Sequence, residues 1–496
     1  MSLISVNNLT FSYPGSYDNI FENVSFQIDT QWKLGFLGRN GRGKTTFLRL
    51  LLGQYEYGGS ISASVSFEYF PYAVEDKAQN TLDVIEGIYA GFMRWELLRE
   101  LSLLDVPEEV LYRPFDTLSN GEQTKVLLTI LFLKENSFLL IDEPTNHLDM
   151  AARASVSSYL NSKQGFILVS HDRAFLDGCI DHVLSINRAN IEVQRGNFSS
   201  WLVNRERQDG YELAENDKLQ REVSRLQKTV REKAGWADTA ERRKLGANTA
   251  ATDNDKAGKR AYLGGQSKKL MKRVKAIEKR QQAVIAEKSE LLKNIESADS
   301  LKMVRLDYHT SRLAALSGVT IRYGEKVACR DVGFTIESGD RIALVGKNGS
   351  GKSSILKLIC GESLTYTGAF ERGSRLIISY VPQDTGFLCG SLSDYARQNG
   401  IDESLFKTVL RKLDFSRVQF EKDMRDFSGG QKKKALIARS LCERAHLYVW
   451  DEPLNYIDVI SRMQIENLIL EFNPTILFVE HDSAFCKRIA TKEVRV

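Results

Sequence analysis

Short apolar runs alternate with helix-like segments in two parts of the chain, one on either side of a polar middle. The runs are Lys33–Leu37, Phe138–Ile141 and Phe166–Val169 in the first part, and Arg341–Val345, Leu447–Trp450 and Thr475–Val479 in the second. Continuous apolar runs of this length are typical of strands that are buried on both faces of a parallel sheet. Their alternation with helices predicts an α/β fold with a largely parallel sheet in each part.

The middle of the chain follows a helical period instead. Apolar residues recur at intervals of three, four or seven at Leu219, Val223, Leu226 and Val230, and again at Leu270, Val274, Ile277, Val284, Leu291 and Ile295. Between the two series the chain is rich in Gly, Ala, Asn, Asp, Thr and Lys. The pattern predicts an antiparallel helical hairpin over residues 206–300, with an irregular tip at about 235–265.

The two α/β parts are copies of one module. GRNGRGKTT (Gly38–Thr46) recurs as GKNGSGKSS (Gly346–Ser354), LSNGEQ as FSGGQK, FLLIDEPTNHLD as LYVWDEPLNYID, and VSHD as VEHD. The offsets are 308 residues for Lys44, 309 for Ser119, 309 for Asp142 and 310 for His171. Four motifs in one order at a nearly constant offset indicate a tandem duplication. We place the first copy at residues 1–205, with a short helical arm at about 75–115, and the second at 301–496.

Charge separates the hairpin from the two copies. The chain of 496 residues has a net charge of only +4, with 42% hydrophobic and 27% charged residues, which are usual values for a globular protein. The window Arg221–Arg280 holds 18 Lys and Arg against 7 Asp and Glu, a net charge of +11, so the remainder of the chain sums to −7. Such a basic hairpin suits the phosphates of a nucleic acid, and a solvated coiled-coil face is the alternative.

The sequence also indicates a compartment. It contains no apolar run long enough to span a membrane, no basic-then-apolar leader at its N-terminus, and no Cys-x-x-Cys pair among its 6 cysteines. We therefore expect a cytoplasmic protein without a membrane span, a disulfide scaffold or a zinc ribbon.

Two glycine-rich loops have the pattern Gly-x-x-x-x-Gly-Lys-Thr/Ser, each between a predicted strand and a predicted helix. The glycines let consecutive backbone N–H groups turn toward an anion, and the helix N-terminus adds partial positive charge. Lys44 and Lys352 are then placed for the β- and γ-phosphates, while Thr45 and Ser353 supply a hydroxyl to Mg²⁺. We expect each loop to bind ATP with Mg²⁺.

An acidic pair and a histidine complete each predicted site. An aspartate at the end of an apolar strand holds Mg²⁺ through water, and the glutamate that follows polarises the attacking water. A histidine after a neighbouring strand is a candidate for contact with the γ-phosphate, although a lone histidine is more often structural. These residues are Asp142, Glu143 and His171 in the first copy and Asp451, Glu452 and His481 in the second.

With these motifs in this order, the chain resembles the ATP-binding cassette superfamily, and LSNGEQ and FSGGQK look like its signature loop. In that family the signature loop of one cassette closes over the ATP held by the other, so the resemblance implies two composite sites. It also implies that Tyr13 and Tyr323 stack on adenine, for which packing within a strand is the alternative. The first implied site comprises Tyr13, Gly38, Asn40, Gly41, Gly43, Lys44, Thr45 and Thr46 with Ser428, Gly429, Gly430 and Gln431; the second comprises Tyr323, Gly346, Asn348, Gly349, Gly351, Lys352, Ser353, Ser354 and Gln383 with Ser119, Gly121 and Glu122.

The two copies depart from each other in the expected motifs. The Mg²⁺-contacting glutamine of the family is matched by Gln383 in VPQD, whereas the corresponding FPYA segment has Tyr72. Asn120 replaces a signature glycine in the first copy. Both copies keep the phosphate lysine and the acidic pair, so we expect two ATP molecules to bind, and the departure at Tyr72 bears on the hydrolysis rate of the first site.

Two cassettes joined by a charged helical hairpin resemble the ABC-F ATPases over essentially the whole chain. Segments such as WKLGFLGRNGRGKTTFLRLL and WELLRELSLLDVPEEVLYRPF look like the antibiotic-resistance branch of Lsa and Vga type. This resemblance implies a monomer that binds the exit site of the bacterial ribosome in its ATP-closed form, contacts ribosomal RNA and P-site tRNA, and leaves after hydrolysis. It implies protection against lincosamides, pleuromutilins and streptogramin A, with neither DNA nor a membrane as a partner.

Two other functions remain open from the sequence. One is the ATPase subunit of a drug-efflux transporter with a separately encoded membrane partner, against which the basic hairpin argues. The other is a translation factor without resistance activity. If the protein confers resistance, it can displace the drug directly or through rearranged RNA and tRNA. The residues expected to approach RNA or the drug region are Lys244, Lys259, Arg260, Tyr262, Lys268, Lys269, Lys272 and Arg273.

Overall fold

The computed structural model describes residues 2–14, 19–134, 136–146, 148–187, 190–208, 306–413 and 415–496, with isolated residues at 210, 211, 214, 218, 221 and 225. The chain divides into two compact units: Met1–Trp201 with Ser300–Val496, which holds both copies of the module, and Leu202–Asp299. Most of the predicted hairpin, its tip and all eight residues expected to approach RNA therefore lie outside the described residues.

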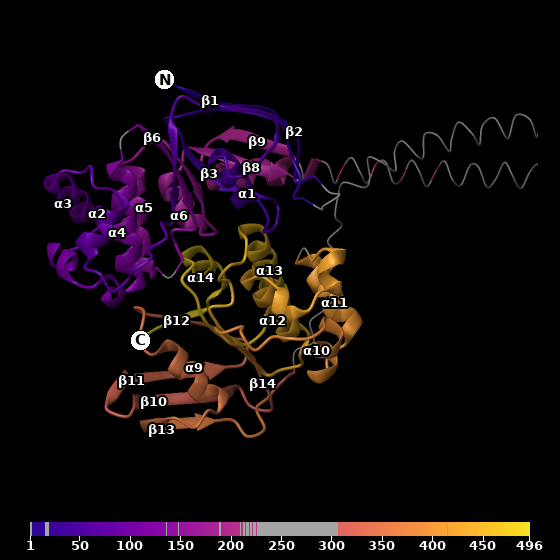
Figure 1. Ribbon diagram of the computed structural model, residues 1–496. Coiled ribbons are helices and arrows are strands. Elements are labelled where there is room, and N and C mark those ends of the chain that lie inside the picture. The colour runs from indigo at the N-terminus through magenta and orange to yellow at the C-terminus, as the bar shows by residue number, and fades with distance from the viewer. Residues whose placement is uncertain are drawn as a thin grey trace, which may run out of the picture. The chain divides into compact units, whose positions relative to one another are not determined.

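The first cassette is built on a six-stranded sheet of order β5-β6-β7-β3-β8-β9, parallel except for the last pair (Figure 1). Its strands are β3 (Lys33–Leu37), β5 (Ser66–Phe70), β6 (Ser137–Asp142), β7 (Phe166–Val169), β8 (His182–Asn187) and β9 (Asn190–Arg195). All four residues of β7 are buried, which explains why its sequence is apolar throughout. A parallel sheet brings the C-terminal ends of β3, β6 and β7 to one edge, and the predicted site residues follow those ends.

A second, antiparallel sheet of order β2-β1-β4 covers this cassette: β1 (Leu3–Phe11), β2 (Phe21–Asp29) and β4 (Gly58–Ser62). Its buried residues share one apolar core with helix α1 (Lys44–Leu51) and with the inner strands of the parallel sheet. Phe47 of α1 lies at the centre of this core, edge-on to Phe21 and Phe36. The core therefore fixes the helix that begins at the glycine-rich loop.

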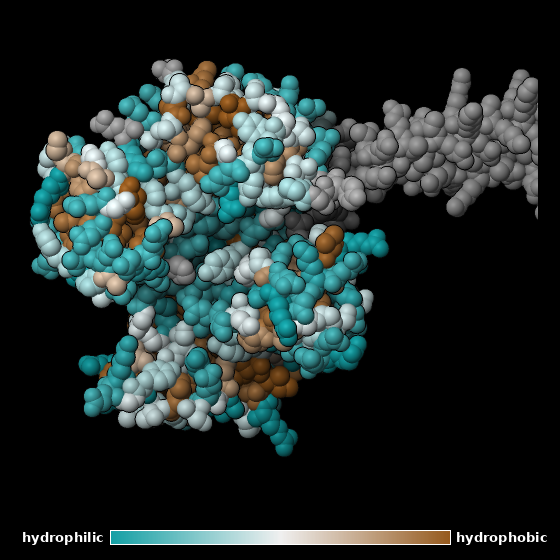
Figure 2. Space-filling model, viewed as in Figure 1, coloured by the Kyte–Doolittle hydropathy of each residue, from teal (hydrophilic) through white to brown (hydrophobic). Residues whose placement is uncertain are grey.

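The remaining helices of the first cassette are α2 (Thr81–Ile88), α3 (Arg94–Leu103), α4 (Asn120–Leu133), α5 (Met150–Asn161) and α6 (Arg173–Cys179), with 3₁₀ turns at Glu108–Tyr112 and Phe115–Thr117. Helix α3 is joined to α5 through Glu100, whose buried carboxylate accepts from Tyr159 Oη at 2.7 Å and from Lys163 Nζ at 2.5 Å. Figure 2 shows hydrophobic residues on the surface over α2–α4. Met93, Trp95 and Tyr112 of this part of the chain are exposed.

The second cassette repeats the plan. A parallel sheet of order β14-β15-β16-β12-β17 combines β12 (Arg341–Val345), β14 (Ile378–Val381), β15 (Leu447–Asp451), β16 (Ile476–Val479) and β17 (Lys492–Arg495). An antiparallel sheet of order β11-β10-β13 combines β10 (Arg312–Tyr323), β11 (Lys326–Glu337) and β13 (Thr365–Arg372). The helices are α9 (Lys352–Cys360), α10 (Leu392–Gln398), α11 (Glu403–Lys412), α12 (Gly429–Cys442), α13 (Val459–Phe472) and α14 (Ser483–Ile489).

The predicted fold class is confirmed: the unit holds two tandem α/β cassettes. The apolar runs 33–37, 166–169 and 341–345 are strands with the expected bounds. The runs 447–450 and 475–479 differ from their strands by one residue at one end, and 138–141 by one residue at each end. The antiparallel sheet of each cassette was not predicted; in the first cassette, β1 and β2 carry no continuous apolar run. Among the described residues, every helix is too short or too polar to span a bilayer.

Candidate nucleotide-binding sites

The glycine-rich loop of the first cassette connects β3 to α1. Gly43 precedes the helix with φ of 90°, and a Cβ at this position would lie 2.5 Å from the side chain of Ile20, so the turn requires glycine. Lys44 Nζ donates to the carbonyl of Gly38 at 2.7 Å. Burial lowers the pKa of Lys44, and the nearby Asp458 carboxylate opposes that effect. The loop thus holds a buried ammonium group at the N-terminus of a helix.

The loop of the second cassette has the same geometry between β12 and α9. Gly351 has φ of 90°, and a Cβ there would lie 2.5 Å from the carbonyl oxygen of Ala328. Lys352 Nζ donates to the carbonyl oxygens of Gly346 at 2.9 Å and Lys347 at 2.8 Å. Burial lowers the pKa of Lys352 as well.

A hydroxyl and an aspartate meet beside each lysine. Thr45 Oγ1 donates to Asp142 Oδ2 at 3.0 Å, and Ser353 donates a hydrogen bond to Asp451. Burial raises the pKa of both aspartates. Asp451 Oδ1 is buried and has no hydrogen-bond partner, and an anionic oxygen in that position suits a hard divalent cation such as Mg²⁺.

Each glutamate that follows these aspartates faces a histidine. His481 Nε2 lies 3.5 Å from Glu452 Oε1, and His171 Nε2 lies 3.0 Å from Glu143 Oε1. Both glutamates have a left-handed backbone, with φ of 46° at Glu452 and 53° at Glu143. Non-glycine residues in this region are strained, and such strain clusters at functional sites. The turn directs each carboxylate away from its strand and toward the histidine.

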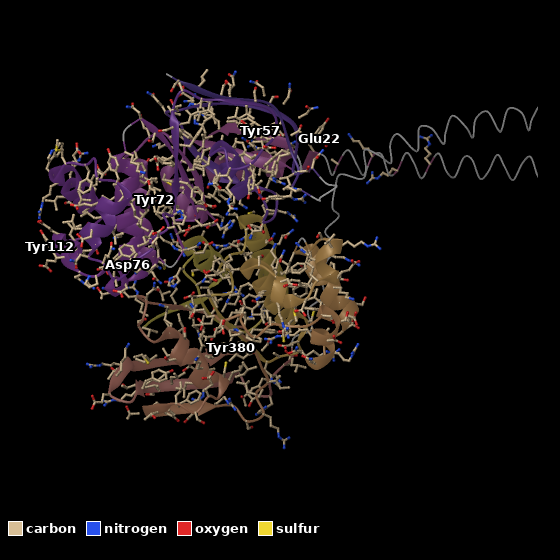
Figure 3. All side chains as sticks on the ribbon, viewed as in Figure 1. Glu22, Tyr57, Tyr72, Asp76, Tyr112 and Tyr380 are labelled. Atoms are coloured by element: carbon tan, nitrogen blue, oxygen red, sulfur yellow. The ribbon has the colours of Figure 1, made fainter. Side chains whose placement is uncertain are left out.

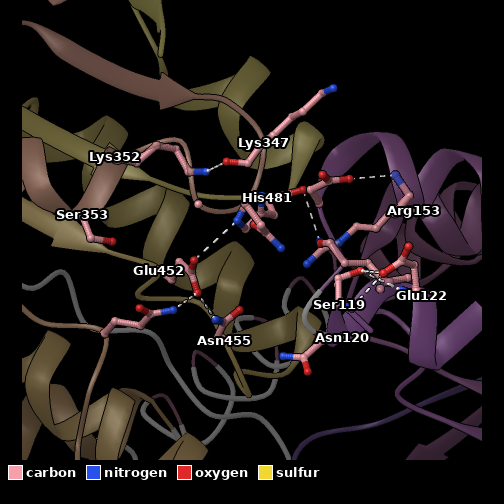
Figure 4. Close-up of a pocket in the computed structure, with 18 of the residues that line it drawn as sticks. Ser119, Asn120, Glu122, Arg153, Lys347, Lys352, Ser353, Glu452, Asn455 and His481 are labelled. Carbon is pink, nitrogen blue, oxygen red and sulfur yellow. Dashed lines mark hydrogen bonds and ion pairs between the residues drawn. The ribbon is translucent and has the colours of Figure 1, made fainter. Parts of the chain in front are cut away.

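The Glu452 carboxylate is the better supported of the two (Figure 4). Gln383 Nε2 donates to Glu452 Oε2 at 2.8 Å, and Asn455 Nδ2 donates to the same oxygen at 2.7 Å. Burial raises the pKa of Glu452, but the hydrogen bond and charge of His481, together with the Gln383 and Asn455 amides, outweigh burial and lower it to about 2. The carboxylate is therefore ionised at neutral pH.

The corresponding segment of the first cassette is arranged differently. Tyr72 lies in this segment (Figure 3). Its Oη donates to Glu68 Oε2 at 3.2 Å, and the ammonium of Lys134 lies 5.0 Å from the centre of its ring. Tyr69, which the sequence analysis did not single out, donates to Asp142 Oδ2 at 3.0 Å. Asp142 of the first cassette thus accepts a hydrogen bond from a phenol, whereas Glu452 of the second accepts from two amides.

The two signature loops begin long helices through reciprocal capping. In α4, Ser119 Oγ accepts from the Glu122 N–H at 3.2 Å while Glu122 Oε2 accepts from the Ser119 N–H at 2.8 Å. In α12, Ser428 and Gln431 form the same pair of bonds, at 3.3 and 2.9 Å. The Ser-x-x-Glu/Gln spacing explains both helix starts.

A cavity of about 950 Å³ lies between the glycine-rich loop of the second cassette and the signature loop of the first (Figure 4). Arg153 borders it and donates to the carbonyl oxygen of His481 at 3.2 Å. The site residues that line this cavity are Tyr323, Asn348, Gly349, Gly351, Lys352, Ser353, Ser354, Gln383, Glu452 and His481, with Ser119, Asn120, Gly121 and Glu122. This volume accommodates a nucleotide-sized ligand.

The other pair of loops is in direct contact. Asn40 Nδ2, in the loop of the first cassette, donates to the carbonyl oxygen of Tyr456 at 2.7 Å, and a Cβ on Gly430 would lie 3.2 Å from the same nitrogen. Gly38, Gly41, Thr46, Ser428 and Gly429 lie in the same two segments. Each glycine-rich loop therefore faces the signature loop of the other cassette, at closer range in the first site.

The predicted adenine-stacking tyrosines lie beside the phosphate loops. Tyr13 Oη is hydrogen-bonded to Thr46 Oγ1 at 2.8 Å, and Tyr323 donates to Ser354 Oγ at 3.2 Å. Tyr323 is half exposed and borders the cavity. Adenine stacking by these two tyrosines remains a prediction, and so do the catalytic roles of the site residues.

The sequence model of the family described as "ABC transporter" matches residues 21–146 and 329–455, which together are just over half of the chain. The chain therefore belongs to this family of ATP-binding cassette proteins. Because its cassettes are those of ATPases, the enzyme hydrolyses ATP.

Curated relatives match nearly the whole chain. The ribosome protection protein VmlR of Bacillus subtilis is 26% identical to it over 99% of this chain and 86% of its own length. The energy-dependent translational throttle protein EttA of Haemophilus influenzae is 25% identical over 95% of this chain and 88% of its own length. These full-length likenesses support a place in the ABC-F group.

A solved structure has the same arrangement of tandem cassettes. The archaeal ribosome recycling factor aABCE1, solved in complex with the ribosomal stalk protein aP1, superposes with a TM-score of 0.63 over 98% of this chain and 87% of its own. The two sequences are 18% identical, so the likeness concerns the fold.

Proposed function

We propose that this ATPase binds the bacterial ribosome in its ATP-closed form and protects translation from antibiotics of the peptidyl-transferase centre, namely lincosamides, pleuromutilins and streptogramin A. The observation that carries the proposal is the segment Leu202–Asp299, a unit of its own between the cassettes whose window Arg221–Arg280 has a net charge of +11. A dense basic segment attached to an ATP-driven pair of domains suits binding to RNA. The likeness to VmlR over the full length supports the same function.

The composite sites supply a mechanism for closing and opening. A nucleotide in the cavity touches Lys352 and the Ser119–Glu122 segment at once, so ATP binding joins the two cassettes. Hydrolysis separates the γ-phosphate from the nucleotide and removes this connection. The protein then opens and leaves the ribosome, whose exit site is occupied only by the closed form.

The second site has the groups that hydrolysis requires. Glu452, ionised and oriented by two amides, positions the attacking water, and His481 lies beside it for the γ-phosphate. Lys352 compensates the charge that develops on the phosphate oxygens. Ser353 and Asp451 would hold Mg²⁺, which neutralises phosphate charge when bound. In the first site Thr45, Asp142, Glu143 and His171 have the corresponding roles.

The decisive experiment is translation in a purified, membrane-free reaction that contains a lincosamide or a pleuromutilin. The protein with ATP should restore synthesis, and the matched Lys44→Ala, Lys352→Ala double variant, which lacks both phosphate lysines, should not. If the wild-type protein gives no rescue, the efflux-subunit function becomes the better explanation.

A translation factor without resistance activity is the second candidate, and the full-length likeness to the translational throttle protein EttA favours it. Deleting Leu245–Gly264 distinguishes the two functions. Protection should vanish while ATP hydrolysis persists if this tip acts at the drug site. A protein that never protects translation, with or without the tip, but changes the rate of uninhibited synthesis would be such a factor.

A further inference from the structure

Lys433 is a buried lysine that belongs to none of the predicted motif positions. It lies in the second turn of α12, the helix that begins with the signature loop of the second cassette, and its side chain is 2% exposed. Lys433 Nζ donates to the carbonyl oxygen of Pro382 at 2.9 Å and lies 3.4 Å from that of Asp451. A long cationic side chain is rarely buried this completely, so its contacts call for an explanation.

The two carbonyl groups stand directly before the two residues that meet in the second site. Gln383 follows Pro382, Glu452 follows Asp451, and the Gln383 amide donates to the Glu452 carboxylate at 2.8 Å. One ammonium group thus fixes the backbone on both sides of this hydrogen bond. A shift of Lys433 moves Gln383 and Glu452 relative to each other.

Glu480, a buried carboxylate near Lys433, also occurs only in the second cassette. Burial lowers the pKa of Lys433, and the carboxylates of Glu480, Asp451 and Glu452 oppose that effect, with Glu480 the strongest of the three. Glu480 is itself buried and accepts from the Leu454 N–H at 2.7 Å and the His481 N–H at 3.1 Å.

The first cassette has hydroxyl residues in both places. Thr124 occupies the position of Lys433 and Ser170 that of Glu480, as the offsets of the flanking motifs show. The Thr124 hydroxyl donates to the carbonyl oxygen of Asn120 in its own helix at 2.8 Å. The described part of the first cassette therefore holds no lysine bridge equivalent to that of Lys433.

The same helix α12 also reaches the first nucleotide site. Its signature residue Gly430 lies against Asn40 of the first glycine-rich loop, and Asn40 donates to Tyr456 just beyond the Glu452 strand end. Engagement of the signature loop at the first site and the placement of Gln383 and Glu452 in the second site therefore depend on one rigid element.

We propose that Lys433 is a positioning residue that couples the two nucleotide sites in one direction. When the second cassette's signature loop closes over the nucleotide in the first site, Lys433 brings Gln383 and Glu452 into the geometry needed to hydrolyse the nucleotide in the second site. The inference rests on the ATPase activity and on the assignment of the two sites, and is independent of the ribosome proposal. The side chain of Thr124 is too short to contact the corresponding carbonyl groups of the first cassette, so closure over the second nucleotide does not position the first site in the same way.

The test uses the full-length chain with Glu143→Gln, so that turnover reports the second site. Lys433→Met should lower kcat by about tenfold or more, because a small displacement of catalytic groups is costly, while KM for ATP stays within about twofold. Thr124→Ala, at the matched position, should leave kcat unchanged. An unchanged kcat in Lys433→Met, or an equal loss in Thr124→Ala, overturns the proposal.

The coupling is tested with Asn40→Ala, which removes the hydrogen bond that Asn40 donates to Tyr456 at the first site. This change should reduce turnover of the second site several-fold when Lys433 is present and by less than about twofold in the Lys433→Met background. An equal reduction of second-site turnover with Lys433 and with Lys433→Met would overturn the proposal that Lys433 transmits the coupling. If Lys433→Met fails to fold, as judged by thermal unfolding and ATP binding, Lys433→Gln replaces it with the same expected split between kcat and KM.

Discussion

Arg173 of the first cassette and Glu466 of the second form a buried ion pair, in which Arg173 Nη1 donates to Glu466 Oε2 at 3.1 Å. Glu466 is fully buried and also accepts from Arg488 Nη1 at 2.7 Å. The positions that correspond to Glu466 and Arg173 in the opposite cassettes are Ser157 and Ser483. The equivalent ion pair therefore cannot form a second time.

Replacing Glu466 by glutamine should destabilise the two-cassette unit strongly. The change leaves the buried guanidinium of Arg173 without this carboxylate, and breaking a buried pair in this way costs about 3–5 kcal/mol. Arg488 is partly exposed, so solvent compensates its loss. Urea unfolding measures the loss. The matched control is Glu403→Gln, which removes the exposed pair with Lys407 on α11 and should cost far less, because solvent screens that pair. Similar losses in both variants would contradict the assigned role of the buried pair.

The double variant Glu143→Gln, Glu452→Gln should bind ATP without hydrolysing it. Glutamine keeps the size of each side chain but cannot act on the attacking water, so the closed form should accumulate. Co-sedimentation with ribosomes in the presence of ATP measures this accumulation, and the same protein without nucleotide is the control. A closed variant that does not sediment with ribosomes argues against the ribosome proposal.

The stability that Glu452 contributes should depend on pH in a defined window. Its pKa falls from an ordinary value of 4.5 in the unfolded chain to about 2 in the folded protein. The contribution is therefore fully present above about 4.5 and is lost progressively as the pH falls toward 2. Unfolding free energies of the wild type and Glu452→Gln, measured between pH 7 and pH 3, should converge on the acid side. A constant difference over that range would exclude the assigned shift.

Ribosome affinity should fall steeply with salt if the basic segment contacts phosphates. Releasing counterions from several phosphate contacts weakens binding by orders of magnitude between about 50 and 200 mM salt. Binding of the Glu143→Gln, Glu452→Gln variant at a series of salt concentrations measures the slope, and replacing Lys268, Lys269, Lys272 and Arg273 by glutamine should reduce it. A ribosome affinity that does not change with salt would favour the alternative, in which these basic residues form a solvated helix face.

Local sequence determined much of what the structure shows. The buried strands could be predicted because a parallel strand covered on both faces must be apolar throughout, as in Phe166–Val169. The starts of α4 and α12 follow from Ser-x-x-Glu and Ser-x-x-Gln, since each cap is satisfied within four residues. The glycine-rich loops follow from glycines at positions that have positive φ.

Apart from the pairing of the glycine-rich and signature loops, which the family resemblance implied, contacts between distant parts of the chain escaped prediction. Asn40 meets Tyr456 across 416 residues and Arg173 meets Glu466 across 293, and no local pattern encodes such pairs. Lys433 is one of three consecutive lysines in QKKK, and the sequence does not reveal which of them the fold buries. Tyr69 was missed for the same reason, because alternation within a strand does not reveal which aspartate lies opposite its hydroxyl.

The left-handed turns at Glu143 and Glu452 set catalysis against folding in this protein. A non-glycine residue in that conformation costs about 1–2 kcal/mol, which glycine would recover. At Glu452, glycine would also remove the hydrogen bonds from Gln383 and Asn455 and the interaction with His481, which lower the pKa of this carboxyl and stabilise the fold. The relief of strain is therefore offset there, and the proposed catalytic carboxylate is lost. Mutations that raise the thermal stability of this ATPase should therefore be made at other positions, with both glutamates unchanged.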